Sequence, residues 1–457
     1  MKPLALSAVA PWCEARLVGE DATVTSVGTD TRRLAAGSLY VALRGERFDG
    51  HDFCAEAAAN GAAALLVQRP VEVALPQLLC GDTLAALGDL AAGLQAERAT
   101  RVVAITGSNG KTSVKTLVHG ILAGVTAAYA NPGNRNNEVG LPLAVIDAPE
   151  DAAWAVYEMG AGQPGDIAYL TSIARPDVAL VNNIGPAHLE RMGSLLGIAQ
   201  TKGAIYEALA PDGIAVINAD DAFAGYFESR AEGRSLLRFG LEASADFTAS
   251  AIRLGAEDSR FTLHAPGGSV AVHLPLAGRH SVMNALAAAA LAVAAGVPLD
   301  AIAEGLGRAE RVGGRQVPHV LHSGAVLVDD SYNANPGSVA AAIDALAAAG
   351  GEAWLVLGDM AELGPGAAVL HAEVGDRARR AGIARLLSLG QASRQASRAF
   401  GDGGRHFERA EDLVDALRRE LRAGVRCLVK GSRSSAMDRV VAQVLAHDAP
   451  GEGDHAA

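Results

Sequence analysis

The sequence predicts an α/β protein with three domains: a small α/β domain followed by two larger doubly wound domains. Three observations indicate this fold class. Short apolar runs alternate with helical stretches, which is typical of parallel strands covered by helices on both faces. The alternation stops at residues 311–316 and then restarts. A chain of 457 residues is also too long for a single hydrophobic core.

Residues 1–99 are expected to form the small N-terminal α/β domain, because short strands and helices alternate there. The opening "MKPLALSAVAPWCEA" has features of a secretory signal peptide, but its apolar run is short and only one charge precedes it. A first helix of the fold is therefore expected instead. Residues 26–53 are rich in Asp, Arg, Ser and Gly, which favours loops.

The central domain is expected over residues 100–312. Four apolar runs predict the buried strands of a mostly parallel sheet: "RVVAIT" (101–106), "AWAVYEM" (153–159), "DVALVNNI" (177–184) and "IAVINAD" (214–220). From 246 to 276 short alternating strands surround "PGG", which predicts an antiparallel addition.

The C-terminal domain, residues 313–448, is predicted to be Rossmann-like and to follow a hinge at "RVGGRQ" (311–316). Its strands are expected at "AVLVDD" (325–330), "AWLVLGD" (353–359), "ARLLSLG" (384–390) and "RCLVKGS" (426–432). Residues 449–457, "APGEGDHAA", are expected to be a disordered tail.

Composition limits the function. The net charge of −12 argues against broad binding to nucleic acid or to anionic membranes, and no stretch has the roughly 18 charge-free apolar residues of a spanning helix. The four cysteines form neither C-x-x-C nor a zinc spacing, so reduced thiols and a cytoplasmic location are expected. They are Cys13, Cys54, Cys80 and Cys427. We expect a monomer.

A glycine loop, "TGSNGKT", follows the first central strand. The usual phosphate loop, G-x-x-x-x-G-K-[ST], would place its first glycine at Ile105, whereas the glycine here is Gly107. Backbone N–H groups entering a helix N-terminus favour anions. Lys111 would reach the terminal phosphates and the Thr112 hydroxyl would meet Mg²⁺. The loop therefore predicts a nucleotide site.

A second glycine string, "GAGQPG" (160–165), matches the dinucleotide pattern G-x-G-x-x-G. That pattern requires an acidic residue about 20 positions further on, where this chain has Asn182 and Asn183. A dinucleotide site is therefore disfavoured.

Glu158 and His188 follow two strands of the central sheet, at the edge where ligands bind in such folds. Magnesium prefers oxygen ligands, so Glu158 is the stronger candidate. Lys202 alone suggests a solvated helix lysine, and Ser281 a helix cap. The polar turn "DDSYNANPGS" (329–338) offers an acid for a ribose or a metal, or a cap for the next helix.

Taken together and in order, these strings resemble the Mur ligases, the ATP-dependent amide-bond-forming enzymes of peptidoglycan synthesis. "TGSNGKT" is that family's form of the loop. "NPGNRNNEVGLP" (131–142), "EMGAGQPGDI", "DDSYNANPGS" and "VLGDMAELG" are similar to the branch that adds D-alanyl-D-alanine to UDP-N-acetylmuramoyl-tripeptide. The D-N-P-R signature of the diaminopimelate- or lysine-adding branch is absent. The resemblance covers about residues 20–440.

The resemblance implies a reaction. ATP phosphorylates the C-terminal carboxylate of the tripeptide, the amine of D-Ala-D-Ala attacks the acyl phosphate, and the tetrahedral intermediate collapses to the amide, ADP and phosphate. The product would be the pentapeptide precursor of peptidoglycan. Such chemistry needs positioning and charge neutralisation more than a protein nucleophile. The third residue of the tripeptide is left open between diaminopimelate and lysine.

The resemblance also implies roles for residues at the ATP and magnesium sites. Lys111, Lys202 and His188 would be catalytic, and Lys202 would be carbamylated to become an acidic ligand. The Mg²⁺ ligands would be Thr112, Glu158, His188 and Lys202. ATP would be held by Gly107, Ser108, Asn109, Gly110, Lys111, Thr112 and Ser113, with Asn284, Arg315 and Asp330 on its adenine, phosphate and ribose sides.

Roles toward the other substrates follow in the same way. The UDP-sugar end would meet Ser26, Asp30, Thr31 and Arg32, and the tripeptide Asn134, Arg135, Asn136, Asn137 and Glu138. D-Ala-D-Ala would bind the third domain, with Arg433 as a partner for its carboxylate. One departure is Ser281, where the family usually has Asn after "GRH". The resemblance therefore assigns no contact to residue 281, whereas it does assign one to Asn284.

Two other functions were weighed. One is a related amide ligase that adds a single amino acid to a different acceptor. The other is a nucleotide-binding regulator without chemistry. The complete set of candidate catalytic and metal-binding residues argues against it: Lys111, Thr112, Glu158 and Lys202.

Overall fold

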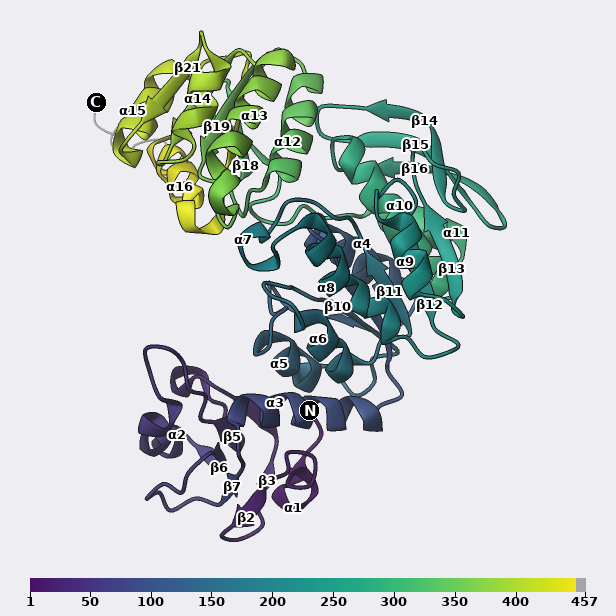
Figure 1. The fold of residues 1–457 in the computed structure, drawn as a ribbon, viewed down its shortest axis with the longest axis vertical. Coiled ribbons are helices and arrows are strands. Elements are labelled where there is room, and N and C mark those ends of the chain that lie inside the picture. Colours follow the sequence, from purple (N-terminus) through teal and green to yellow (C-terminus); the bar gives the residue numbers. More distant parts are fainter. Residues whose placement is uncertain (449–457) are drawn as a thin grey trace, which may run out of the picture.

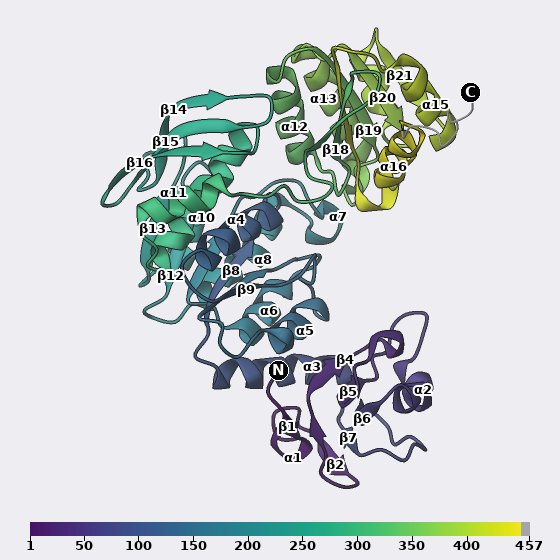
Figure 2. The ribbon, with the colours of Figure 1, turned by 180° about the vertical axis from the view of Figure 1, so that it is seen from behind.

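The computed structural model describes residues 1–448, and the predicted tail 449–457 lies outside the described residues. The chain forms three units in sequence order, with the central one between the other two (Figures 1 and 2). The α/β prediction is confirmed, since helices cover both faces of the two larger sheets. Within residues 1–448, no helix is both long and apolar enough to cross a membrane.

The N-terminal unit has a five-stranded sheet and a two-stranded pair. Its elements are β1 (Leu4–Ala5), α1 (Leu6–Val9), β2 (Arg16–Val18), β3 (Thr23–Val24), β4 (Ser26–Gly28), β5 (Ser38–Val41), α2 (Cys54–Ala59), β6 (Ala62–Val67), β7 (Gln77–Leu79) and α3 (Thr83–Glu97). The sheet order is β2-β7-β6-β5-β4, with only the β2–β7 pair antiparallel. The predicted first helix is confirmed: Leu6 and Val9 in α1 are fully buried.

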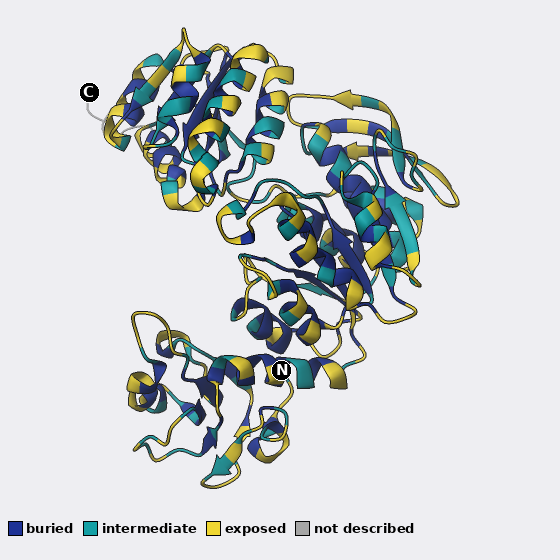
Figure 3. Cartoon of the chain, in the orientation of Figure 1, coloured by how far each residue is buried: buried dark blue, intermediate teal, exposed yellow. Residues whose placement is uncertain are grey.

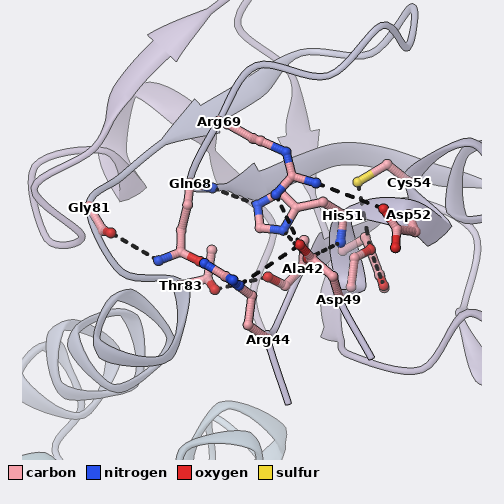
Figure 4. Close-up of polar contacts among 12 residues, drawn as sticks. Ala42, Arg44, Asp49, His51, Asp52, Cys54, Gln68, Arg69, Gly81 and Thr83 are labelled. Atoms are coloured by element: carbon pink, nitrogen blue, oxygen red, sulfur yellow. Dashed lines mark hydrogen bonds and ion pairs between the residues drawn. The ribbon is translucent and has the colours of Figure 1, made fainter. Parts of the chain in front are cut away.

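A buried histidine organises the loops of this unit (Figure 4). The Nε2 atom of His51 accepts the backbone N–H of Gln68 at 2.9 Å. Its proton therefore resides on Nδ1, which lies 2.6 Å from Asp49 Oδ1. Arg69 donates to the other carboxylate oxygen of Asp49 at 3.0 Å. The backbone N–H of His51, together with these partners, holds the pKa of Asp49 well below its usual range.

The central unit is built on a six-stranded parallel sheet of order β13-β12-β11-β8-β10-β9. Its strands are β8 (Arg101–Thr106), β9 (Ala128–Ala130), β10 (Trp154–Glu158), β11 (Val178–Val181), β12 (Ile214–Asn218) and β13 (Ser235–Phe239). Its helices are α4 (Lys111–Ala123), α5 (Gly140–Asp147), α6 (Asp166–Ala174), α7 (Leu189–Met192), α8 (Leu195–Glu207), α9 (Ala224–Arg230), α10 (Arg279–Ala294) and α11 (Leu299–Gly307).

Strand β8 is buried on both faces, as its continuous apolar run predicts. Val102 and Ala104 pack into one core, whereas Val103 and Ile105 pack into the other. The predicted antiparallel addition is confirmed as a three-stranded sheet that packs beside α10 and α11 (Figures 1 and 2). Its strands are β14 (Thr248–Leu254), β15 (Ser259–Ala265) and β16 (Gly268–Leu274).

The C-terminal unit has a second six-stranded sheet, of order β17-β18-β22-β19-β20-β21, in which only the β17–β18 pair is antiparallel. Its elements are β17 (Val317–Val320), β18 (Val326–Asp330), α12 (Pro336–Ala348), β19 (Glu352–Gly358), α13 (Ala367–Arg380), β20 (Arg385–Leu389), α14 (Arg394–Phe400), β21 (Gly404–Phe407), α15 (Ala410–Glu420), β22 (Val425–Lys430) and α16 (Met437–Asp448).

The boundaries of the hydrophobic cores differ from those of the three units. Buried strands stand out in the central and C-terminal sheets (Figure 3). One core is continuous from the N-terminal unit into the central one, because α3 contributes Leu87, Leu90 and Leu94 to the same cluster as Val102 and Ile167. The C-terminal unit has two cores of its own.

We expect His51→Leu to loosen the N-terminal unit. The Gln68 amide would lose its acceptor inside the protein, and an unpaired buried group costs about 1–3 kcal/mol. Hydrogen exchange followed by mass spectrometry should show faster exchange across β6 and Gln68. The exposed neighbour Asp52 provides the control, since Asp52→Ala should leave this exchange unchanged. Equal protection in His51→Leu and the unmodified chain would contradict the expectation.

Candidate active site

The glycine loop joins the end of β8 to the start of α4 in a backbone path that glycine permits. Gly107 has φ +147° and Gly110 has φ +77°, values that side-chain-bearing residues rarely adopt. A Cβ atom on Gly110 would lie 2.5 Å from Asn182 Nδ2 and 2.6 Å from Asn284 Oδ1. The loop is thus pressed against two amide side chains, and α4 begins directly after it. This is the geometry that exposes backbone N–H groups to an anion.

The two asparagines after β11 support this loop. Asn183 accepts the backbone N–H of Asn109 at 2.8 Å through Oδ1 and that of Ser108 at 2.9 Å through its carbonyl. Asn182 Nδ2 donates to the carbonyl of Asn109 at 3.0 Å. The same two asparagines, which disfavour a dinucleotide site, thus hold the glycine loop in place.

Glu158 ends β10 beside the start of α4. Its carboxylate accepts from Thr112 Oγ1 and from Asn136 Nδ2, each at 2.8 Å, and lies 3.5 Å from Lys115 Nζ. Burial acts to raise the pKa of Glu158, but the charges of Lys111 and Lys115 and the two hydrogen bonds outweigh it and lower that pKa. Glu158 is therefore an ionised carboxylate next to the Thr112 hydroxyl.

Lys115 is a functional candidate that the sequence reasoning missed. Its Nζ atom donates to the carbonyls of Asn131 at 2.9 Å and Gly133 at 2.8 Å, and so ties α4 to the segment that carries Asn136. Its position four residues after Lys111, on the same helix face, was the signal available in the sequence.

Lys202 lies in α8 and is 1% exposed, so its interpretation as a solvated helix lysine is wrong. Burial holds the pKa of Lys202 far below its usual value, and the nearby charge of Lys111 lowers it further, while Asp166 acts in the opposite direction. Lys202 is therefore a buried amine whose pKa is strongly lowered.

His188 has the left-handed backbone angle φ +59°, which is uncommon for a side-chain-bearing residue. Its Nδ1 atom lies close to a carboxylate oxygen of Glu362 in the C-terminal unit, and the φ of Glu362 is +60°. The backbone N–H of Glu190 also donates to the Glu362 carbonyl at 3.3 Å. Burial lowers the pKa of His188, against the opposing effect of Glu362.

Two further side chains join the C-terminal unit and the preceding hinge to the phosphate loop. Arg315 Nη2 donates to Thr112 Oγ1 at 2.9 Å. Asn335 Nδ2 donates to Asn109 Oδ1 at 2.8 Å. Asn335 is also the N-cap of α12, where its Oδ1 accepts the N–H of Ser338 at 2.9 Å. The cap of α12 is thus this asparagine, while Asp329 accepts from Ser331.

Asp330 and Lys430 end the neighbouring strands β18 and β22 in register. They form a buried ion pair of 2.8 Å, which leaves Asp330 oriented by a lysine that the sequence reasoning did not select. Ser281 is not a helix cap. The N-cap of α10 is Gly278, and Ser281 Oγ donates to the Ala277 carbonyl at 2.7 Å.

A cleft of about 1390 Å³ lies where the central and C-terminal units meet. Most of the residues selected from the sequence for ATP, metal and tripeptide line it, whereas Gly107, Arg135 and Lys202 are not among its lining residues. The selected residues that do line it are Ser108, Asn109, Gly110, Lys111, Thr112, Ser113, Asn134, Asn136, Asn137, Glu138, Glu158, His188, Asn284, Arg315, Asp330 and Arg433. Arg135 instead pairs with Asp147 at 2.8 Å.

The four N-terminal candidates lie apart from this cleft, in the first unit. Asp30 pairs with Arg32 at 2.8 Å and Thr31 Oγ1 donates to Glu56 at 2.8 Å. Ser26 Oγ is buried and has no partner within the described residues.

The donors around Thr112 suit a hard cation. Among residues 1–448, no cluster of three or more His, Cys, Asp or Glu side chains could hold a metal ion by itself. The hydroxyl of Thr112 and the carboxylate of Glu158 are nevertheless the oxygen ligands that Mg²⁺ prefers, and this ion usually completes its shell with water and substrate phosphates. The residues present therefore fit Mg²⁺ bound together with a nucleotide.

Comparisons with known families cover most of the chain. Residues 23–97 match the Mur ligase family catalytic domain, residues 105–292 the Mur ligase middle domain, and residues 307–433 the glutamate ligase domain of Mur ligases.

Among curated proteins, UDP-N-acetylmuramoyl-tripeptide–D-alanyl-D-alanine ligase of Escherichia coli K12 is 46% identical over 96% of this chain and 98% of its own. The enzyme of the same name from Bacillus subtilis 168 is 34% identical over 93% of this chain and 94% of its own.

Solved structures agree. A crystal structure of MurF from Acinetobacter baumannii superposes with a TM-score of 0.93 at 32% identity, covering 98% of this chain and 99% of that one. MurF of Thermotoga maritima in complex with ADP has a TM-score of 0.82 at 29% identity, covering 92% of this chain and 97% of that one.

Substitutions at Asn335 should separate its two roles. In Asn335→Asp a carboxylate oxygen still caps α12, but the donor to Asn109 is lost, so hydrogen exchange of α12 should match the unmodified chain. Asn335→Ala removes the cap as well, which typically costs about 1 kcal/mol, and should speed exchange in the first turn of α12. Equal exchange in both variants would contradict the capping role.

Proposed function

The chain belongs to the Mur ligase family, and we infer that it joins D-alanyl-D-alanine to UDP-N-acetylmuramoyl-tripeptide in an ATP-dependent reaction. The identity to curated ligases with this activity, 46% and 34% over nearly full length, supports the assignment of the reaction. The reaction forms an acyl phosphate on the tripeptide and releases ADP and phosphate.

The observation that carries this function is the environment of Thr112. Its hydroxyl donates to Glu158 on one side and accepts from Arg315 on the other, at the end of a phosphate loop. Transfer of a phosphoryl group to a carboxylate brings negative charges together, so it requires fixed positive charge and exact alignment more than a nucleophilic side chain. Lys111, Lys115 and Arg315 supply that positive charge around one anionic oxygen site.

We propose that residues 107–113 hold the phosphates of ATP. Lys111 Nζ donates to the Gly107 carbonyl at 2.8 Å across the loop, which keeps the ammonium within reach of the terminal phosphate. Asn284 is proposed for the adenine side, Arg315 for the phosphates and Asp330 for the ribose. One carboxylate oxygen of Asp330 already accepts a hydrogen bond from Lys430, which leaves the other oxygen for the ribose.

Mg²⁺ is proposed to be held by Thr112, Glu158 and His188, where it would neutralise phosphate charge during transfer. Lys202 is proposed to join them as a carbamate. Burial strongly lowers the pKa of this amine, which favours its neutral form, and only a neutral amine can attack carbon dioxide. The N–C bond forms as a proton leaves, and the product is an anion suited to a cation.

The three units are proposed to divide the substrates between them. Residues 1–99 would bind the UDP-sugar through Ser26, Asp30, Thr31 and Arg32, and residues 134–138 of the central unit, 100–312, would contact the tripeptide. The C-terminal unit, 313–448, would receive D-Ala-D-Ala, with Arg433 as the partner of its carboxylate. A cytoplasmic location is proposed as well, which the four buried free cysteines support.

ADP release is expected only when both the UDP-N-acetylmuramoyl-tripeptide and D-Ala-D-Ala are present with ATP, because the amine must consume the acyl phosphate. A coupled ADP assay across a panel of peptide acceptors measures this. Equal ADP release without either substrate would refute the ligase function. Replacing the dipeptide by diaminopimelate, lysine or glutamate tests the single-amino-acid ligase, which a preference for one of them would favour.

Lys202→Ala is expected to lower activity by at least about tenfold, since a metal ligand would be lost. A short-chain carboxylic acid should partly restore it by supplying the missing carboxylate. Lys202→Arg, which introduces a permanent positive charge and cannot form a carbamate, should stay inactive. ¹³C NMR with labelled bicarbonate should show a carbamate signal only in the unmodified chain. A fully active, bicarbonate-independent Ala variant would exclude the carbamate.

A further inference from the structure

Tyr332 brings the two arginines proposed for phosphate and dipeptide to one aromatic ring. The guanidinium carbon of Arg315 lies 4.4 Å from the ring centroid, and that of Arg433 lies 5.9 Å from it. Tyr332 belongs to the polar turn between β18 and α12, whereas Arg315 belongs to the hinge segment before β17. All three residues line the cleft.

The backbone of the hinge is already held on this turn. The N–H of Tyr332 donates to the Gly314 carbonyl at 3.1 Å. Gly314 has φ +69°, and a Cβ atom there would lie 3.2 Å from the Cβ of Tyr332. Gln316 follows with φ +54°. These contacts fix where the main chain of Arg315 lies, but not where its long side chain ends.

Few polar contacts restrict the guanidinium of Arg315. Its Nη2 donates to Thr112 Oγ1 at 2.9 Å, whereas its Nε is buried without a partner within the described residues. An arginine side chain carries about 2 kcal/mol of rotamer entropy, so a single hydrogen bond leaves much of its freedom. The flat face of an aromatic ring attracts a guanidinium and limits the plane it can adopt.

We propose that Tyr332 is a positioning residue, whose ring holds the guanidinium of Arg315 over Thr112 so that ATP meets a pre-oriented positive charge. This inference rests on the proposed function, in which Arg315 faces the phosphates. The Tyr332 ring would thereby complete the nucleotide site of the central unit by orienting Arg315. The attraction depends on the ring and not on the phenol hydroxyl.

The test compares four variants by their KM for ATP: Tyr332→Phe, Tyr332→Leu, Arg315→Ala, and the last two combined. The backbone hydrogen bond to Gly314 survives in every Tyr332 variant, so only the side chain beyond Cβ changes. A partly unfolded preparation lowers kcat without moving KM, which makes KM the deciding readout. The unfolding temperature of each variant is measured alongside.

Tyr332→Leu should raise the KM for ATP roughly tenfold, a size within the range of cation–π pairs, while Tyr332→Phe should stay within about twofold of the unmodified chain. Once Arg315 is already alanine, adding Tyr332→Leu should change KM by less than about twofold, because coupled residues are not additive. That pattern supports the positioning role.

Three results would overturn it: Tyr332→Phe as damaging as Tyr332→Leu, Tyr332→Leu without effect, or Tyr332→Leu equally damaging with and without Arg315. In each of these cases a raised KM in Arg315→Ala would leave the proposed function standing. An unchanged KM in Arg315→Ala would instead remove the phosphate role of Arg315, and the positioning role with it.

Discussion

The parallel register of three central strands determines where the charged groups of the cleft lie. Ile105 of β8 stands opposite Glu158 of β10 on one side and Leu180 of β11 on the other. The three strands therefore end at the same edge, so the phosphate loop, the Glu158 carboxylate and the amides after β11 converge there. A slip of one residue would turn Glu158 to the opposite face of the sheet and remove the acceptor of Thr112.

The parallel strands of the C-terminal sheet also end at one edge, and this carboxyl edge faces the same cleft. Asp330 and Lys430 end β18 and β22 side by side there. The contacts across the cleft are polar: they run from Arg315, Asn335 and Glu362 to the loop, helix and histidine of the central unit. Such contacts can break and re-form at small cost, which suits a site that must admit three substrates.

Much of this arrangement could be predicted from the sequence, and the failures have a common physical origin. Strands buried on both faces were predicted from their continuous apolar runs, as in β8. Within the two large sheets, the strands that no run predicted are the edge strands, where one side meets solvent and the pattern weakens. They are β9, β13, β17 and β21. The glycine loop could be recognised in the sequence because its residues are contiguous. The burial of Lys202, the reach of Lys115 and the stacking of Tyr332 depend on segments far apart in the chain, which no local pattern encodes.

The continuous core through α3 has a consequence for how the protein is made. Because Leu87, Leu90 and Leu94 pack in the same cluster as Val102 and Ile167, the core that α3 shares with the central unit cannot be completed before much of that unit has left the ribosome. The C-terminal unit, with cores of its own, is free to form afterwards. Synthesis would thus yield two cooperative folding units from three structural ones, and the catalytic cleft would come into existence only when the second unit joins the first.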